Sequence, residues 1–232
     1  MSFTRLVFIF HALCLSLAAC SQAPEPSTIK RILFVGNSYT FQHQVPKQVA
    51  GRLSKLHGPD VAYVATMVAD GGQNLIKYVD DPRILKAFEA NAFDYIVLQD
   101  QSTATFYAVD HQDFFKAVRW FKTKATAEGA EIILYQTWPR RDGHDFYSQR
   151  PRRGFTPPST PQEMRVRLEK TYQQAAQASG AQVAPVGNCW MQRGNHAALY
   201  QRDGSHATRE GAALAANVIA QTIAGHADPC AT

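Results

Sequence analysis

The chain has 232 residues, of which 45% are hydrophobic and 19% are charged, and this composition suits one globular domain with a sizeable core. Its formal net charge is +5, but the basic residues are spread along the chain and form no dense runs, which argues against a nucleic-acid-binding protein. Neither Cys-x-x-Cys nor His-x-x-x-His occurs, so the sequence predicts no metal site.

The N-terminus has the features of a removed secretory signal over residues 1–19. Arg5 supplies a short basic start, and residues 6–17 form an apolar stretch that is too short to span a bilayer easily. The sequence Leu17-Ala18-Ala19-Cys20 then resembles a bacterial lipobox, in which the cysteine is lipidated and becomes the new N-terminus. The alternative is an ordinary signal peptide followed by a chance cysteine.

We expect residues 20–29 to form a flexible, Pro-rich tether that starts at the lipidated Cys20, and residues 30–232 to form the folded domain. Ser21, and not an aspartate, follows the cysteine. The resemblance to sorted lipoproteins therefore implies a lipid-anchored protein of the bacterial cell envelope, at the outer membrane and facing the periplasm.

An unbroken apolar run over residues 32–35 leads directly into the turn sequence Gly36-Asn37-Ser38. The run predicts a short buried strand, and the turn places a serine just past the carboxyl end of that strand. Ligands of open α/β sheets bind at the carboxyl ends of the strands, so Ser38 is a candidate nucleophile. The alternative is a turn serine that only satisfies backbone hydrogen bonds.

The next segments alternate between helix and strand. We expect a helix over residues 46–56 with Pro46 at its first position, a strand over residues 61–68, a helix over residues 82–91 and a strand over residues 93–98. Asp70-Gly71-Gly72 follows the second strand, and its glycines allow backbone N–H groups to approach a ligand closely. A plain strand-to-helix turn is the alternative.

Four polar residues, Gln99-Asp100-Gln101-Ser102, close the third strand. Asp110 is predicted to cap a long helix that ends before Gly129, and residues 132–135 form the fourth strand. Residues 138–158 make a long irregular stretch with five arginines, which should lie on the same rim as Ser38. This stretch either forms a wall of the substrate site or is a solvated basic loop.

Thr160-Pro161-Gln162-Glu163 is a capping box that starts a helix to residue 179. A fifth strand is expected over residues 183–186, where Pro185 indicates an edge strand, and Thr208 caps the closing helix. Because strands and helices alternate throughout, the sequence predicts a three-layer α/β/α fold with a mainly parallel five-stranded sheet.

Cys189 and Cys230 remain after the cysteines of the signal and the lipobox have been assigned. In an oxidising periplasm two remaining cysteines favour a disulfide. Two unrelated buried thiols are the alternative.

Two motifs at opposite ends of the domain together resemble the SGNH hydrolases, also called the GDSL esterase/lipase family. Gly36-Asn37-Ser38 matches the first block, which normally reads Gly-Asp-Ser, and Asp203-x-x-His206 matches the last. Weaker matches to the second and third blocks are Asp70-Gly71-Gly72-Gln73-Asn74 and Leu98-Gln99-Asp100-Gln101-Ser102. The resemblance covers the chain from about residue 30 and implies the flavodoxin-like arrangement of that family.

The resemblance implies a catalytic triad of Ser38, His206 and Asp203. A serine hydroxyl needs a base within hydrogen-bond reach, and His206 can accept its proton and return it to the leaving alcohol. Asp203 can hold the imidazole in the required tautomer and stabilise the imidazolium.

The resemblance also implies an oxyanion hole, formed by the backbone N–H groups of Ser38 and Gly72 and by a side-chain amide of the third block. That block usually supplies an asparagine, whereas this sequence offers Gln101, with Gln99 as the competing candidate. Asn37 in place of the usual aspartate is a second departure, which concerns support of the turn more than the chemistry.

These features predict a serine esterase that cleaves a carboxylic ester with a short acyl group, for example acetyl on a saccharide, through an acyl-enzyme. A lysophospholipase or lipase of the same fold and a non-catalytic envelope lipoprotein are the alternatives. The expected partners are an ester substrate, small or glycan, and a membrane bound through the N-terminal lipid. No nucleic acid, cofactor or metal is expected.

Overall fold

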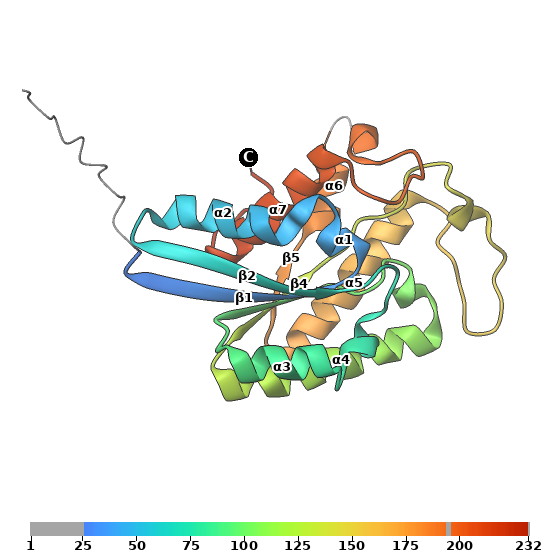
Figure 1. The fold of residues 1–232 in the computed structure, drawn as a ribbon. Coiled ribbons are helices and arrows are strands. Elements are labelled where there is room, and N and C mark those ends of the chain that lie inside the picture. The colour runs from blue at the N-terminus through green and yellow to red at the C-terminus, as the bar shows by residue number, and fades with distance from the viewer. Residues whose placement is uncertain (1–25, 194–195, 232) are drawn as a thin grey trace, which may run out of the picture.

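The computed structural model describes residues 26–193 and 196–231. Its strands are β1 (Thr28–Gly36), β2 (Val61–Ala69), β3 (Tyr95–Leu98), β4 (Glu131–Tyr135) and β5 (Gln182–Ala184). They form one sheet in the order β2-β1-β3-β4-β5, and every neighbouring pair is parallel (Figure 1). This is the flavodoxin-like order, so the predicted parallel five-stranded sheet is confirmed.

Helices cover both faces of the sheet and complete the predicted three-layer α/β/α fold (Figure 1). They are α1 (Ser38–Phe41), α2 (Val45–His57), α3 (Pro82–Ala90), α4 (Ala108–Glu128), α5 (Pro161–Ser179), α6 (Val186–Gln192) and α7 (Arg209–Ile223). Residues of α2, α6 and α7 share one buried cluster, and residues of α3, α4 and α5 share the other. Among the described residues, no helix is long and apolar enough to cross a membrane.

The alternation of side chains along β1 explains why this strand is apolar without a break. Ile32 and Phe34 belong to the cluster beneath α2, α6 and α7, whereas Leu33 and Val35 belong to the opposite cluster. All four side chains are fully buried. Successive residues of a strand point to opposite faces, so a central strand covered on both faces needs apolar residues at every position.

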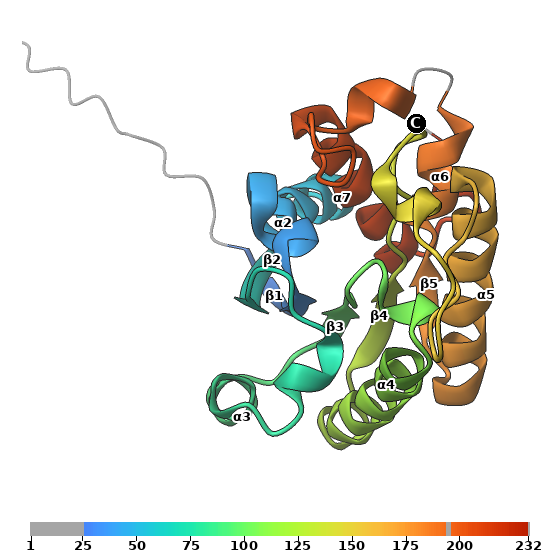
Figure 2. The same cartoon turned by 90° about the vertical axis from the view of Figure 1, so that its right-hand side faces the viewer.

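The order of the strands places a topological switch point between β1 and β3. The chain leaves β1 towards α2 on one face of the sheet and leaves β3 towards α4 on the other face. Figure 2 looks onto the edge where these strands end. The diverging connections leave a crevice outside the carboxyl ends of the strands, which is where ligands of such sheets bind.

Three boundaries differ from those expected from the sequence. β5 ends at Ala184, and Pro185 is already the N-cap of α6. β1 begins at Thr28, which pairs with Val61, so this strand starts inside the predicted tether. Asp110 does not cap α4 but lies in its first turn, because the helix already begins at Ala108, whose N–H donates to the Gly154 carbonyl (2.7 Å). The signal, Cys20 and the tether up to residue 25 lie outside the described residues.

A disulfide joins Cys189 of α6 to Cys230 near the end of the chain, with a Cα–Cα distance of 5.1 Å. Cys189 is buried in the cluster that α6 shares with α7. The cross-link therefore ties the segment after α7 to the short helix α6, and the pairing is the one expected from the sequence.

A buried carboxyl group connects the end of β3 to the segment that follows β2. Asp100 is only 1% exposed, and its Oδ1 accepts a hydrogen bond from the Leu75 N–H (2.7 Å). Its Oδ2 is buried and has no hydrogen-bond partner. Burial raises the pKa of Asp100 to about 7, although hydrogen bonds from the N–H groups of Leu75 and Gln101 oppose the shift.

The raised pKa of Asp100 predicts a pH-dependent stability. Below pH 4 the carboxyl is protonated in both states, but between about pH 4 and pH 7 only the unfolded chain ionises, so rising pH favours unfolding. Relative to Asp100→Asn, the wild-type protein should lose up to about 4 kcal/mol of unfolding free energy between pH 4 and pH 8. Chemical denaturation at several pH values measures this difference.

The control for this experiment is Asp142→Asn, which removes one carboxylate from an exposed position. We would conclude that burial does not keep the Asp100 carboxyl protonated if the wild type and Asp100→Asn differed in unfolding free energy by the same amount at every pH from 4 to 8.

Candidate active site

Ser38 lies immediately after β1, where Asn37 shapes the turn. Asn37 is the N-cap of α1, and its Oδ1 accepts from the Tyr39 N–H (3.1 Å). Its Nδ2 donates to the Gln73 carbonyl (3.0 Å) in the segment after β2. An asparagine can make both bonds because its amide accepts and donates, which an ionised aspartate cannot do. The departure from Gly-Asp-Ser thus supports the turn and links it to the second block.

Gln99, which directly follows β3, braces the same turn from inside the protein. Its side chain is fully buried, and its Oε1 accepts from the Asn37 N–H (2.9 Å) and from the Thr40 hydroxyl (2.8 Å). A Cβ on Gly36 would lie 2.4 Å from Thr40 Oγ1 and 2.6 Å from Gln99 Oε1. Only glycine permits this close approach, so Gly36 and Gln99 together hold Ser38 at the end of the sheet.

The three residues of the expected triad lie in one chain of contacts. Ser38 Oγ is 3.0 Å from His206 Nε2, and His206 Nδ1 is 2.5 Å from Asp203 Oδ2. The other carboxylate oxygen of Asp203 accepts from the N–H groups of Ser205 (2.9 Å) and His206 (3.0 Å). The imidazole is thus fixed at one end and faces the serine hydroxyl at the other.

Electrostatics keep the Asp203 carboxyl ionised. Burial alone would raise its pKa, but hydrogen bonds from the His206 ring and from the backbone N–H groups of Ser205 and His206 outweigh burial and lower the pKa to about 2. A carboxylate that stays charged at neutral pH can orient the His206 ring and stabilise its protonated form.

Aromatic packing positions the segment that carries His206. The Tyr39 and Trp138 rings are stacked at a centroid distance of 4.2 Å, and Trp138 is stacked on Trp190 at the same distance. The Trp138 Nε1–H donates to the Ser205 carbonyl (2.9 Å), next to His206. The stack therefore connects α1, the segment after β4 and α6 to the loop that carries His206.

A pocket of about 260 Å³ opens over Ser38 and His206 and includes the second and third blocks. Gly71 and Gly72 line one side, and Gly72 has a positive φ of 71° that favours glycine. Gln101 lines the same pocket, and its Oε1 accepts from the N–H (2.5 Å) and the hydroxyl (2.7 Å) of Thr103. With that oxygen bound, the amide nitrogen is the polar group that Gln101 can direct to a ligand.

The third block thus contains two glutamines with different surroundings. Gln99 is buried and bonded to the Ser38 turn, whereas Gln101 is partly exposed in the pocket. Sequence reasoning left open which of them faces the substrate, and it missed the brace formed by Gln99. The signal that pointed to Gln99 was its place directly after a buried strand, where an unused polar group is costly.

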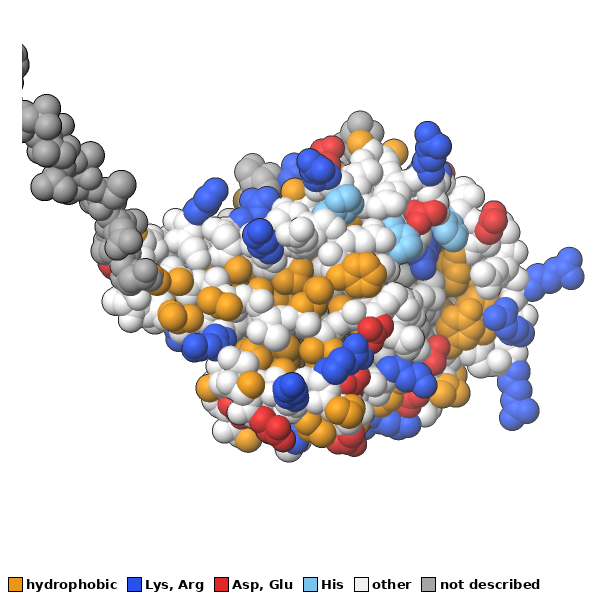
Figure 3. Space-filling model, in the orientation of Figure 1, with side chains coloured by type: hydrophobic (Ala, Val, Ile, Leu, Met, Phe, Trp, Pro, Cys, Tyr) orange, Lys and Arg blue, Asp and Glu red, His pale blue; other side chains and the backbone are white. Residues whose placement is uncertain are grey.

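The loop expected over residues 138–158 takes part in the pocket through its first residues. Arg140 lines the pocket, and the Arg141 N–H donates to the Gly204 carbonyl (2.8 Å) beside Asp203. Farther on, the loop extends away from the sheet in Figure 1, and Figure 3 shows basic side chains standing out from that end of the molecule. The first part of the loop therefore borders the pocket, and a later part extends away from the sheet.

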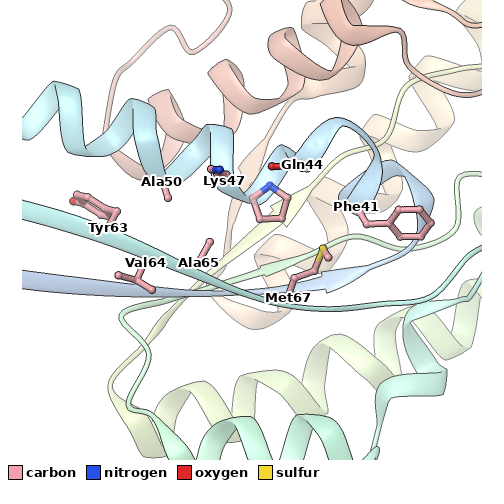
Figure 4. Close-up of a pocket in the computed structure, with 9 residues that line it drawn as sticks. Phe41, Gln44, Lys47, Ala50, Tyr63, Val64, Ala65 and Met67 are labelled. Atoms are coloured by element: carbon pink, nitrogen blue, oxygen red, sulfur yellow. The ribbon is translucent and has the colours of Figure 1, made fainter.

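A larger hollow of about 440 Å³ lies between α2 and the edge strand β2 (Figure 4). Its wall is mostly apolar, with Phe41 and Met67 towards one end and Tyr63 towards the other. None of the described residues that line it is a serine, a histidine or a carboxylate. The smaller pocket over Ser38 is therefore the candidate active site.

Comparison with known proteins identifies the fold. No family model and no curated protein matches the chain. Among solved structures, a proposed SGNH hydrolase from Slackia heliotrinireducens shares 28% sequence identity with a TM-score of 0.68, over 84% of this chain and 99% of that chain. The lipase/acylhydrolase from Enterococcus faecalis shares 17% identity with a TM-score of 0.59, over 86% of this chain and 98% of that chain.

A catalytic mutant of an acetylxylan esterase from Geobacillus stearothermophilus matches with 11% identity and a TM-score of 0.57, over 85% of this chain and 94% of that chain. The likeness to this esterase and to the Enterococcus protein is one of fold. The chain is thus similar in sequence and fold to a proposed SGNH hydrolase, and it shares its fold with a lipase/acylhydrolase.

Proposed function

We propose that the protein is a serine esterase that hydrolyses a carboxylic ester through an acyl-enzyme on Ser38. The observation that carries the proposal is the chain of contacts from Ser38 Oγ through the His206 ring to the Asp203 carboxylate. A nucleophile, a base and a group that orients the base are the parts that acyl transfer requires. A binding protein has no need of this arrangement.

In the proposed reaction, Ser38 Oγ attacks the ester carbonyl while His206 Nε2 accepts the hydroxyl proton. Asp203 holds the Nδ1–H and stabilises the charge that forms on the ring. Collapse of the tetrahedral intermediate breaks the bond to the alcohol, and His206 returns the proton to the leaving oxygen. Water, activated by the same histidine, then attacks the acyl-enzyme and releases the acid.

The oxyanion hole that we assign consists of the N–H groups of Ser38 and Gly72 and the amide nitrogen of Gln101. All three residues line the pocket, and the Thr103 contacts of the Gln101 oxygen orient its amide. Donors placed before the reaction starts stabilise the developing negative charge without reorganisation.

The size of the pocket favours a short acyl group, and acetyl on a saccharide is the substrate that we favour. An acetylxylan esterase among the structural neighbours is consistent with this choice. A lysophospholipase or lipase would use the same chemistry on a longer chain. Aryl esters from acetyl to octanoyl separate the two, because turnover should fall along the series for a short-acyl esterase and rise for a lipase.

We further propose that the protein is lipid-anchored and faces the periplasm from the outer membrane.

The triad residues should act as a unit. Ser38→Ala and His206→Ala should each lower kcat for 4-nitrophenyl acetate by at least about 1,000-fold, and the double variant should lose little more than either single variant. Ser148→Ala, at an exposed serine outside the pocket, is the matched control and should keep full activity. Activity above a few per cent in Ser38→Ala would rule out Ser38 as the nucleophile.

The two glutamines of the third block should give different defects. Gln101→Ala should lower kcat by about 100- to 1,000-fold with less effect on KM, since it removes an oxyanion donor. Gln101→Asn should also be poor because its shorter stem does not reach. Gln99→Ala should lower the melting temperature as well, which Gln101→Ala should not, because it leaves the buried Asn37 N–H without an acceptor. Unchanged kcat in Gln101→Ala would remove Gln101 from the oxyanion hole.

A further inference from the structure

The active-site pocket contains a cation that the proposed ester hydrolysis does not use. Arg140 lines the pocket together with Ser38 and His206. Its Nη1 donates to the Tyr39 hydroxyl (2.6 Å), and the guanidinium carbon lies 6.0 Å from the centre of the Tyr39 ring. The guanidinium is therefore held beside the triad by a neutral phenol.

Within the part of the chain that the structure describes, no carboxylate pairs with Arg140. Among the described residues, none of those that line the pocket is an aspartate or a glutamate, and none of the ion pairs involves Arg140. Its Nε is buried and has no hydrogen-bond partner. Arg83 differs in this respect, because it contacts Asp70 and Asp81. A part-buried cation without an anion is costly, and a negatively charged ligand would remove that cost.

The backbone of Arg140 is fixed on both sides, which limits the freedom of the side chain. The Tyr147 hydroxyl donates to the Arg140 carbonyl (2.5 Å), and the Arg140 N–H approaches Met164 Sδ (3.3 Å). A guanidinium held in this way can offer two parallel N–H groups to a carboxylate at little cost in entropy. Support of Tyr39 alone would not need a charge, because the Ser205 hydroxyl already lies 2.9 Å from the phenol.

We propose that Arg140 binds a carboxylate of the substrate, so that the preferred ester is acidic, such as an acetylated uronic acid. This proposal rests on the ester hydrolysis proposed above. In this assignment Arg140 selects the substrate and leaves the chemistry to Ser38 and His206. The carboxylate would lie on the alcohol part of the ester, within a pocket that admits one small unit.

The test compares methyl glycosides of O-acetylated galacturonate and O-acetylated galactose, which differ in one carboxylate. The wild type should prefer the acidic ester in kcat/KM by about 10- to 100-fold, the range of a charge-assisted hydrogen-bond pair, and mainly through KM. In Arg140→Gln this ratio should fall to about one, and in Arg140→Lys it should be intermediate. Because both esters are compared in the same variant, a general loss of activity caused by losing the Arg140–Tyr39 hydrogen bond cancels in the ratio of the two kcat/KM values.

Arg153→Gln is the matched control, because it removes the same charge from an exposed position of the same loop, and it should keep the wild-type ratio. A wild-type ratio of one or below, or a ratio that Arg140→Gln leaves unchanged, would overturn the proposal. Calorimetry with the unacetylated methyl galacturonide and methyl galactoside provides a readout that needs no turnover. If the wild type binds the galacturonide and Arg140→Gln does not, carboxylate recognition by Arg140 is supported. If the wild type does not bind the galacturonide, carboxylate recognition is contradicted.

The two proposals can fail separately. If the wild type hydrolyses none of these esters and no 4-nitrophenyl acetate, the esterase assignment is wrong, while calorimetry still decides whether Arg140 recognises a carboxylate. If 4-nitrophenyl acetate is hydrolysed but the acidic and neutral sugars are treated alike, the esterase assignment holds and the role of Arg140 is refuted.

Discussion

The buried side chain of Gln99 is the contact on which the geometry of the site depends. It accepts hydrogen bonds from the turn that carries Ser38, and it belongs to the segment that follows β3. The carboxyl ends of β1 and β3 are thereby joined at the point where their connections diverge to opposite faces of the sheet. Gly36 makes this approach possible, because any side chain there would overlap Gln99 and Thr40. Ser38 is thus fixed to the sheet itself.

His206 reaches Ser38 from a position 168 residues later in the chain, and aromatic stacking holds it there. Trp138 stacks between Tyr39 and Trp190, and its indole N–H is bonded to the Ser205 carbonyl. Trp190 lies in α6, next to the disulfide between Cys189 and Cys230. The position of Ser38 therefore depends on the sheet, whereas that of His206 depends on packing between loops and α6.

Local signals predicted most of the fold. Apolar runs marked the strands, and Thr160 and Thr208 cap their helices as expected. The spaced motifs predicted which residues meet in the pocket. The roles of Gln99 and Arg140 could not be predicted from the sequence. They depend on which side chain points inward after a strand has ended, and strand alternation no longer determines this direction there. The expectation that Asp110 caps α4 was wrong for a related reason: the helix begins three residues earlier, where the Ala108 N–H bonds to Gly154, a residue distant in sequence.

The central claim is that Ser38 is an activated nucleophile, and covalent labelling tests it most directly. A fluorophosphonate probe reacts with a serine only when a neighbouring base and oxyanion donors activate it. We predict that the wild-type protein gains one probe adduct, located on Ser38 by peptide mass spectrometry, and that Ser38→Ala and His206→Ala gain none. A folded wild-type protein that stays unlabelled, or an adduct on another residue, would contradict the account.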